Sequence, residues 1–183
     1  DPSRIYDDFD PKTTKFLNVK ATGYQWYWGY EYAGGGENGE FGVAEEVSFD
    51  SIMLADDERG ADDPRLLAVD NEMVVPVNTF VRLQVTAADV LHAFAMPSFG
   101  IKLDGVPGRL NETYFKAERE GLFYGQCSEL CGKDHAFMPI AVRVVSEDQF
   151  RIWVAAAAED VENANKALVG LIEAEKTNKV ALR

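Results

Sequence analysis

Short runs of apolar or alternating residues, separated by turn residues, fill most of the first 145 positions of the chain. Runs of this kind that are rich in Val, Leu and aromatic residues are typical of β-strands. The predicted strands lie at 16–20, 24–32, 47–54, 65–69, 72–77, 79–86, 111–117, 121–126 and 140–145. Strands so closely spaced favour a sandwich or barrel over alternating β and α units. The sequence therefore predicts an all-β domain.

Local features refine this pattern. In the segment 24–32, large aromatic residues recur with a period of two, which predicts that they share one face of a single strand. These residues are Trp26, Trp28, Tyr30 and Tyr32. Pro76 cannot donate to a sheet ladder, so we expect it at a strand end or on an edge strand. The glycine-rich segment 33–42 predicts a flexible loop, and the acidic segment 56–64 predicts a solvated one.

The pattern changes from strand to helix at Ser146. Ser146 followed three residues later by Gln149 is a capping-box signature, which marks the start of a helix. The alanine-rich segment that follows predicts helix in two pieces up to about Glu175. The predicted organisation is an N-terminal arm (1–17), one β-domain (18–146) and a helical extension (147–183).

Charge and hydropathy limit the partners of the chain. It has 183 residues, and 31 acidic against 18 basic residues give a formal net charge of -13. An acidic protein is a poor ligand for nucleic acid, because phosphate binding needs a basic surface. Acidic residues suit a basic protein partner, although they also simply keep proteins soluble. No apolar run approaches the roughly 18 residues that a bilayer requires, which predicts a soluble or peripheral chain.

Candidate chemistry is concentrated in one segment. The chain has two cysteines and two histidines, and three of these four residues fall between 127 and 135. One thiolate, one imidazole and one thioether (Cys131, His135 and Met138), together with a distant histidine, are the donor set of a blue-copper site. The distant histidine is His92, which follows the predicted strand 79–86 and is expected on a second loop at the same end of the domain.

Cys127 adds one thiolate more than a single blue copper needs. Two thiolates can instead bridge two copper ions, each with one histidine, while Met138 and the backbone carbonyl of Glu129 supply weak axial donors. A tetrahedral zinc site made of both cysteines and both histidines is also chemically sound, but it gives Met138 no role. A disulfide between Cys127 and Cys131 is possible by spacing and leaves the histidines unexplained. Residue chemistry places copper ahead of zinc and leaves all three readings open.

Several motifs together resemble subunit II of the haem–copper cytochrome c oxidases. They lie at 25–28, 89–92, 96–102, 104–111, 124–132 and 137–140, and the similarity runs from about Ala21 to Trp153. The resemblance implies a cupredoxin-like β-sandwich that holds the dinuclear copper centre CuA. The implied copper ligands are His92, Cys127, the Glu129 carbonyl, Cys131, His135 and Met138.

The resemblance also implies roles outside the copper ligands. The Glu129 carboxylate would bind magnesium at the interface with subunit I, for which a hard oxygen donor is suited. Trp26 would be the point of electron entry from cytochrome c, whereas without the resemblance it would be interpreted as an ordinary core aromatic. A docking surface for basic cytochrome c would include the acidic residues Asp89, Glu31, Glu46 and Asp50.

The implied function is that of a respiratory-chain translocase subunit that accepts electrons from cytochrome c and passes them to haem in subunit I. The two transmembrane helices that normally precede this domain are absent from the sequence. We therefore expect a truncated or a split subunit II, which associates with the membrane through partner chains. The expected location is the intermembrane-space side of the mitochondrial inner membrane, with the periplasmic side of a bacterial membrane as the alternative.

Two other functions use a similar donor set. A CuA domain of nitrous-oxide reductase shares the centre, but that family usually carries tryptophan between the cysteines, where this chain has Glu129. A zinc-stapled structural or binding domain of a larger assembly needs only the two cysteines and two histidines. Metal content distinguishes the zinc domain from either copper protein.

Overall fold

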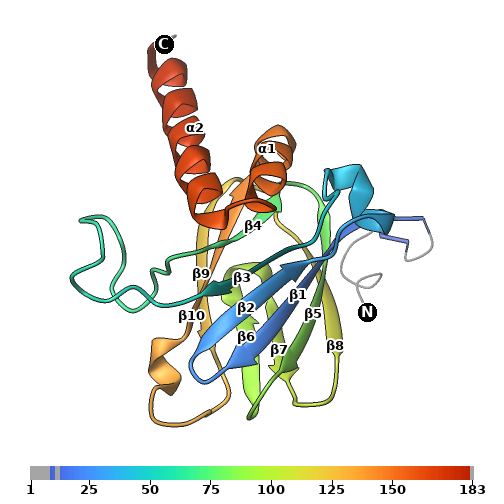
Figure 1. Ribbon diagram of the computed structural model, residues 1–183, viewed down its shortest axis with the longest axis vertical. Helices are drawn as coiled ribbons and strands as arrows, with labels where there is room; N and C mark the ends of the chain where they lie inside the picture. Colours follow the sequence, from blue (N-terminus) through green and yellow to red (C-terminus); the bar gives the residue numbers. More distant parts are fainter. Residues whose placement is uncertain (1–8, 11–12, 182–183) are drawn as a thin grey trace.

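Two five-stranded sheets form the body of the protein in the computed structural model, which describes residues 9–10 and 13–181 (Figure 1). The first sheet has the order β3-β2-β1-β5-β8 and the second the order β4-β10-β9-β6-β7. The first contains β1 (Phe16–Tyr24), β2 (Tyr27–Tyr32), β3 (Val47–Ser51), β5 (Phe80–Ala87) and β8 (Asn111–Lys116). The second contains β4 (Met73–Pro76), β6 (His92–Met96), β7 (Ile101–Gly105), β9 (Gly121–Cys127) and β10 (Pro139–Val145). The predicted all-β sandwich is confirmed.

Each sheet combines parallel and antiparallel pairs. In the first sheet β1 runs antiparallel to β2 and parallel to β5, and in the second β10 runs antiparallel to β9 and parallel to β4. Pro76 is the last residue of the edge strand β4, as its missing N–H predicts.

The core lies between the two sheets, where alternate residues of each strand point inward. Leu17 and Val19 of β1 are completely buried, as are Leu83 and Val85 of β5. Tyr32 joins the two layers directly, because its hydroxyl donates to the Val74 carbonyl (2.9 Å) and accepts from the Val74 N–H (2.9 Å). Burial raises the pKa of Tyr32 well above its usual value, so the neutral phenol is held in place to make both bonds.

Two helices follow the last strand. They are α1 (Glu147–Ala157) and α2 (Val161–Ala181), and they lie at the end of the sandwich opposite the β9–β10 connection (Figure 1). The capping box is confirmed, since Ser146 Oγ accepts from the Gln149 N–H and Gln149 Oε1 accepts from the Ser146 N–H (both 3.2 Å). Within the described residues, neither helix is both long and apolar enough to span a bilayer.

Several predicted elements differ from the structure. The single strand expected over 24–32 is wrong, because a turn at Gln25 and Trp26 separates β1 from β2. The segment 65–69 forms a turn and not a strand, and the predicted loop 33–42 contains a 3-10 helix, η2 (Gly36–Phe41). Most of the predicted arm 1–17 lies outside the described residues. Within it Phe9 packs against Phe80, and β1 begins at Phe16.

Candidate metal centre

The connection between β9 and β10 forms a compact loop. Cys127 is the last residue of β9, and Met138 directly precedes β10. The Cys127 N–H donates to the Met138 carbonyl (3.3 Å), which closes the loop at its base. The Ser128 N–H donates to the Ala93 carbonyl (2.9 Å), which fastens the loop to β6. Side chains of the loop are therefore held beside the first residues of β6.

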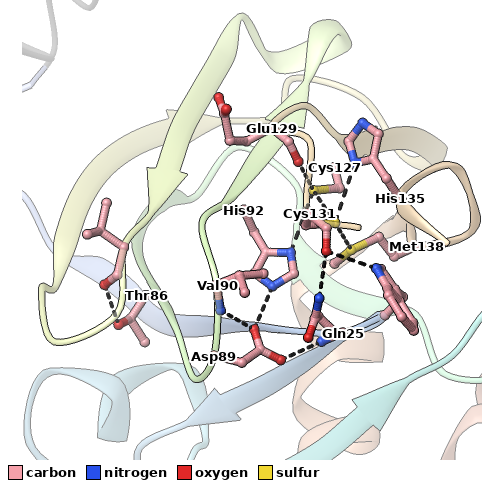
Figure 2. A network of polar contacts seen from close by, with 12 residues as sticks. Gln25, Thr86, Asp89, Val90, His92, Cys127, Glu129, Cys131, His135 and Met138 are labelled. Carbon is pink, nitrogen blue, oxygen red and sulfur yellow. Dashed lines mark hydrogen bonds and ion pairs between the residues drawn. The ribbon is translucent and has the colours of Figure 1, made fainter. Parts of the chain in front are cut away.

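Three sulfur atoms and two imidazole rings meet at this loop (Figure 2). Cys127 Sγ lies 3.9 Å from Cys131 Sγ and 3.8 Å from His92 Nδ1. Cys131 Sγ lies 3.4 Å from His135 Nδ1 and 3.5 Å from Met138 Sδ. The structure thus brings together all five side chains that the sequence singled out as candidate ligands.

Glu129 presents its two ends in different directions. Its backbone carbonyl oxygen lies 3.4 Å from Cys127 Sγ, on the edge of the sulfur cluster. Its carboxylate points away from the sulfur atoms (Figure 2). The carbonyl is therefore available to the cluster while the carboxylate is available to a different ligand.

The donor atoms have the spacing and the chemistry of a metal site. Bonds of about 2.3 Å to sulfur and 2.0 Å to nitrogen place two donors on one tetrahedral ion roughly 3.5 to 3.8 Å apart. The separations of 3.4 to 3.9 Å around the cysteine sulfurs match that spacing. Thiolate, thioether and imidazole together are the ligands that copper prefers. Both cysteines are free thiols and buried, so the disulfide alternative is not what the structure contains.

The two thiols differ in acidity. Burial is the largest single influence on Cys127 and opposes its ionisation, but its hydrogen bonds, of which the one with His92 is the strongest, together outweigh burial and lower the pKa to about 6. Burial and the negative charge on Cys127 raise the pKa of Cys131 to about 12. Ionisation of one thiol therefore opposes ionisation of the other, and a metal that binds both sulfurs must displace their remaining protons.

His92 is the first residue of β6 and is completely buried. The expectation that it lies on a loop is wrong, since β6 pairs with both β7 and β9 and is an inner strand of the second sheet. Its Nε2 donates to Asp89 Oδ1 (2.9 Å), which leaves Nδ1 facing Cys127. Burial disfavours the charged ring, but the hydrogen bonds with Cys127 and Asp89 outweigh burial and raise the pKa of His92.

Gly23 of β1 provides the space in which the His92 ring lies. A Cβ atom at this position would be 2.8 Å from both Cγ and Cδ2 of the imidazole. We expect Gly23→Ala to push the ring away from Cys127 and to weaken copper binding about tenfold or more, the usual cost of disturbing the support of a metal ligand. Copper titration followed by absorbance measures this. Gly170→Ala is the control, because a Cβ on Gly170 meets no atom within 4 Å.

Trp26 lies in the turn between β1 and β2 and contacts the loop that connects β9 and β10. Its Nε1 donates to the Cys131 carbonyl (3.1 Å), and Gln25 Nε2 donates to the same oxygen (2.8 Å). Gly132 allows the close approach, because a Cβ there would lie 2.9 Å from the indole ring and its φ is +124°. Trp26 is half-buried and packs against the edge of the core, so the interpretation as a buried core aromatic is wrong.

The four acidic residues predicted for docking are not all in one place. Glu31, Glu46 and Asp50 line a groove of about 370 Å³ on the outer side of β2 and β3. Glu31 also pairs with Lys20 of β1 (2.8 Å). Asp89 instead contacts the His92 ring. The structure therefore groups three of these residues and places the fourth at the metal centre.

Gly23 and Gln25 contribute to the site although the sequence did not identify them. Gln25 stands next to Trp26 in an aromatic motif, which was a usable signal. Gly23 lies within an ordinary strand and contacts His92 only across the sandwich, so no local pattern marks it.

A family model described as "Cytochrome C oxidase subunit II, periplasmic domain" matches residues 17–145. The chain belongs to this family. Among curated members of the cytochrome c oxidase subunit II family, the probable subunit 2 of Rickettsia bellii is 46% identical over 82% of this chain and 53% of its own length. The subunit 2 of Metridium senile is 49% identical over 79% of this chain and 55% of its own length. The chain thus spans about half the length of these relatives.

Solved structures of subunit II agree with the fold. The periplasmic domain of subunit II (CoxB) of Bradyrhizobium japonicum is 58% identical, with a TM-score of 0.69 over 79% of this chain and 95% of that chain. A mixed disulfide between the thioredoxin-like TlpA and subunit II of cytochrome c oxidase contains a chain 54% identical, with a TM-score of 0.66 over 85% of this chain and 99% of that one. Membership of this family implies a copper centre, and the cluster of His92, Cys127 and Cys131 fits one.

Proposed function

We propose that this chain is the electron-entry part of a cytochrome c oxidase. In this proposal a dinuclear copper centre, CuA, is held at the β9–β10 loop, receives electrons from cytochrome c and delivers them to haem in subunit I. The proposed copper ligands are His92, Cys127, the Glu129 carbonyl, Cys131, His135 and Met138. Membership of the subunit II family supports this function over that of nitrous-oxide reductase.

The observation that carries the proposal is the placement of the two histidines on different sulfurs. His92 lies beside Cys127, and His135 lies beside Cys131. Each half of the cluster therefore has its own imidazole, as two bridged copper ions require. Met138 adds a soft donor beside Cys131, and the Glu129 carbonyl adds a weak oxygen donor beside Cys127.

The same placement argues against a single zinc ion. A tetrahedral ion needs four donors that all lie roughly 3.5 to 3.8 Å apart. Among the histidine, cysteine and acidic residues that the structure describes, His92, Cys127 and Cys131 form the only group of three or more whose donor atoms all lie within 4.8 Å of one another. His135 stands outside that group of three, and zinc would leave the Met138 contact unused.

The protein residues prepare the centre for electron transfer. When bound, the two copper ions supply a carrier that gains and loses one electron with little change in bond length. Burial of both thiols and of Met138 excludes water from the sulfur atoms. The strand pairing of β6 with β9 fixes His92 relative to Cys127, so the ligands cannot rearrange freely. A buried, rigid set of ligands keeps the reorganisation energy of the centre low.

Partners and location follow from the same proposal. The Glu129 carboxylate, which points away from the sulfur cluster, would bind magnesium at the contact with subunit I. Membrane association would occur through partner chains. We place the domain on the intermembrane-space side of the mitochondrial inner membrane, with the periplasmic side of a bacterial membrane as the alternative. The groove lined by Glu31, Glu46 and Asp50 would contribute to docking of basic cytochrome c.

Metal analysis tests the proposed function most directly. We expect two copper ions per chain, with the purple colour and mixed-valence electron spin resonance spectrum of a copper pair that shares one unpaired electron. Cys131→Ser should abolish the pair spectrum because it removes one bridging thiolate. Ser128→Ala, which alters an exposed neighbour, should leave it unchanged. One colourless zinc ion per chain would refute the proposal.

A further inference from the structure

Both carboxylate oxygens of Asp89 are engaged in hydrogen bonds at the metal centre (Figure 2). Oδ1 accepts from the His92 ring Nε2 (2.9 Å) and from the Val90 N–H (2.6 Å). Oδ2 accepts from the backbone N–H of Gln25 (2.8 Å), which lies in the turn that carries Trp26. One side chain thus contacts a candidate copper ligand and the candidate entry turn at the same time.

We infer that Asp89 is a positioning residue that couples the His92 ligand to the electron-entry turn, rather than only a docking acid. The inference rests on the proposed function, since it assigns Asp89 a role at the same copper centre. Asp89 contributes no donor to the cluster itself. It acts through His92 on one side and through Gln25 on the other.

The contacts of Asp89 complete a closed ring of hydrogen bonds and side-chain contacts that includes both cysteines. Gln25 is held at its backbone N–H by Asp89, and its side chain donates to the Cys131 carbonyl (2.8 Å). Cys131 faces Cys127, which faces His92, which returns to Asp89. Trp26 donates to the same Cys131 carbonyl (3.1 Å). Loss of Asp89 would therefore loosen the His92 ring and the Trp26 turn together.

A carboxylate behind a metal-bound histidine also has an electronic effect. With metal bound, Asp89 would hold the proton on Nε2 and leave the lone pair of His92 Nδ1, on the side of Cys127, free for the metal, and it would raise the basicity of that nitrogen. A more basic ligand with a negative charge behind it stabilises the oxidised centre more than the reduced one. Removing Asp89 should therefore raise the reduction potential.

A docking role makes different demands on an acidic residue. A docking acid acts through long-range charge, and its effect on association fades as salt screens it. Asp50 satisfies this description, because it is exposed and lines the groove on β2 and β3. Asp89 is also exposed, with 33% of its side chain accessible, but both of its carboxylate oxygens accept hydrogen bonds from protein donors.

The test compares Asp89→Ala and Asp89→Asn with Asp50→Asn in the copper-loaded full chain assembled in the oxidase. For Asp89→Ala we expect a raised reduction potential, an altered histidine hyperfine coupling and a copper affinity lowered about 10- to 100-fold. Its kcat for cytochrome c oxidation should fall at every salt concentration. Asp89→Asn keeps one acceptor oxygen and should restore part of these losses. Asp50→Asn should raise KM at low salt only and leave potential and spectrum unchanged.

The result that would overturn the inference is an Asp89→Ala protein with the normal potential and spectrum, whose only defect is a KM increase that vanishes at high salt. A second readout does not depend on copper. The Gln25 amide should be protected from hydrogen exchange in the metal-free, reduced chain and should lose that protection in Asp89→Ala. An unchanged Gln25 exchange rate in Asp89→Ala would also refute the inference that Asp89 holds the Gln25 turn. Absence of copper from the wild type would instead refute the proposed function.

Discussion

Trp26→Ala is expected to slow electron entry from cytochrome c about tenfold or more, equivalent to at least about 1.4 kcal/mol of activation free energy. The indole ring is half-buried, and its Nε1 donates to the carbonyl of Cys131 (3.1 Å). Because part of the ring reaches the protein surface, it offers a continuous path from there to Cys131, a proposed copper ligand. Alanine at this position replaces the path with solvent. Stopped-flow oxidation of reduced cytochrome c measures the change.

Copper content and salt dependence are the controls for this variant. Trp26 supplies no donor atom, so two copper ions should remain bound. Wild type and variant should both slow steeply as salt rises, because the exposed acids of the Glu31, Glu46 and Asp50 groove are screened equally in both. Trp26→Phe keeps a ring but loses the Nε1 donor. Its rate of electron entry should therefore lie between those of the wild type and Trp26→Ala. A Trp26→Ala protein that accepts electrons at the normal rate would show that entry occurs elsewhere.

Most strands could be predicted because they bury one face and expose the other. In β5 the burial alternates residue by residue from Val81 onward, which is the period that the sequence displays. The strand β6 was missed because all five of its residues are buried, so His92–Met96 shows no alternation. The run 24–32 was predicted as one strand because aromatic residues continue through the turn at Trp26. Periodicity alone does not mark a turn made of large residues.

The candidate ligands were accessible from sequence because their chemistry is rare in this chain. Two cysteines and two histidines leave few ways to assemble a site, and the spacing of Cys127, Cys131 and His135 already places three donors on one loop. The supporting contacts were not accessible. Asp89 lies three residues before His92, so that contact is local, but only the fold brings its second oxygen to the N–H of Gln25, 64 residues away. The link between the ligand and the turn is therefore a property of the packed sandwich.

The packing of β6 against β9 sets the distance between His92 and Cys127, and Gly125 is the residue that permits it. A Cβ at Gly125 would lie 2.0 Å from the Ala95 carbonyl oxygen of β6, far inside any contact distance. Gly125→Ala must therefore separate the two strands where Phe94 faces Cys127. We expect a loss of about 3 kcal/mol in the free energy of unfolding, at the upper end of overpacking effects.

We expect Gly125→Ala to weaken copper binding as well as to lower stability, because His92 and Cys127 lie on the two strands that move apart. Chemical denaturation followed by circular dichroism gives the stability of the metal-free chain, and copper analysis gives the second readout. Gly170→Ala makes the same chemical change on α2, where a Cβ has no neighbour within 4 Å. It should be neutral or stabilising by up to about 1 kcal/mol, since alanine is the better helix former. Equal stability of the two variants would mean that β6 and β9 are not packed as closely as Gly125 implies.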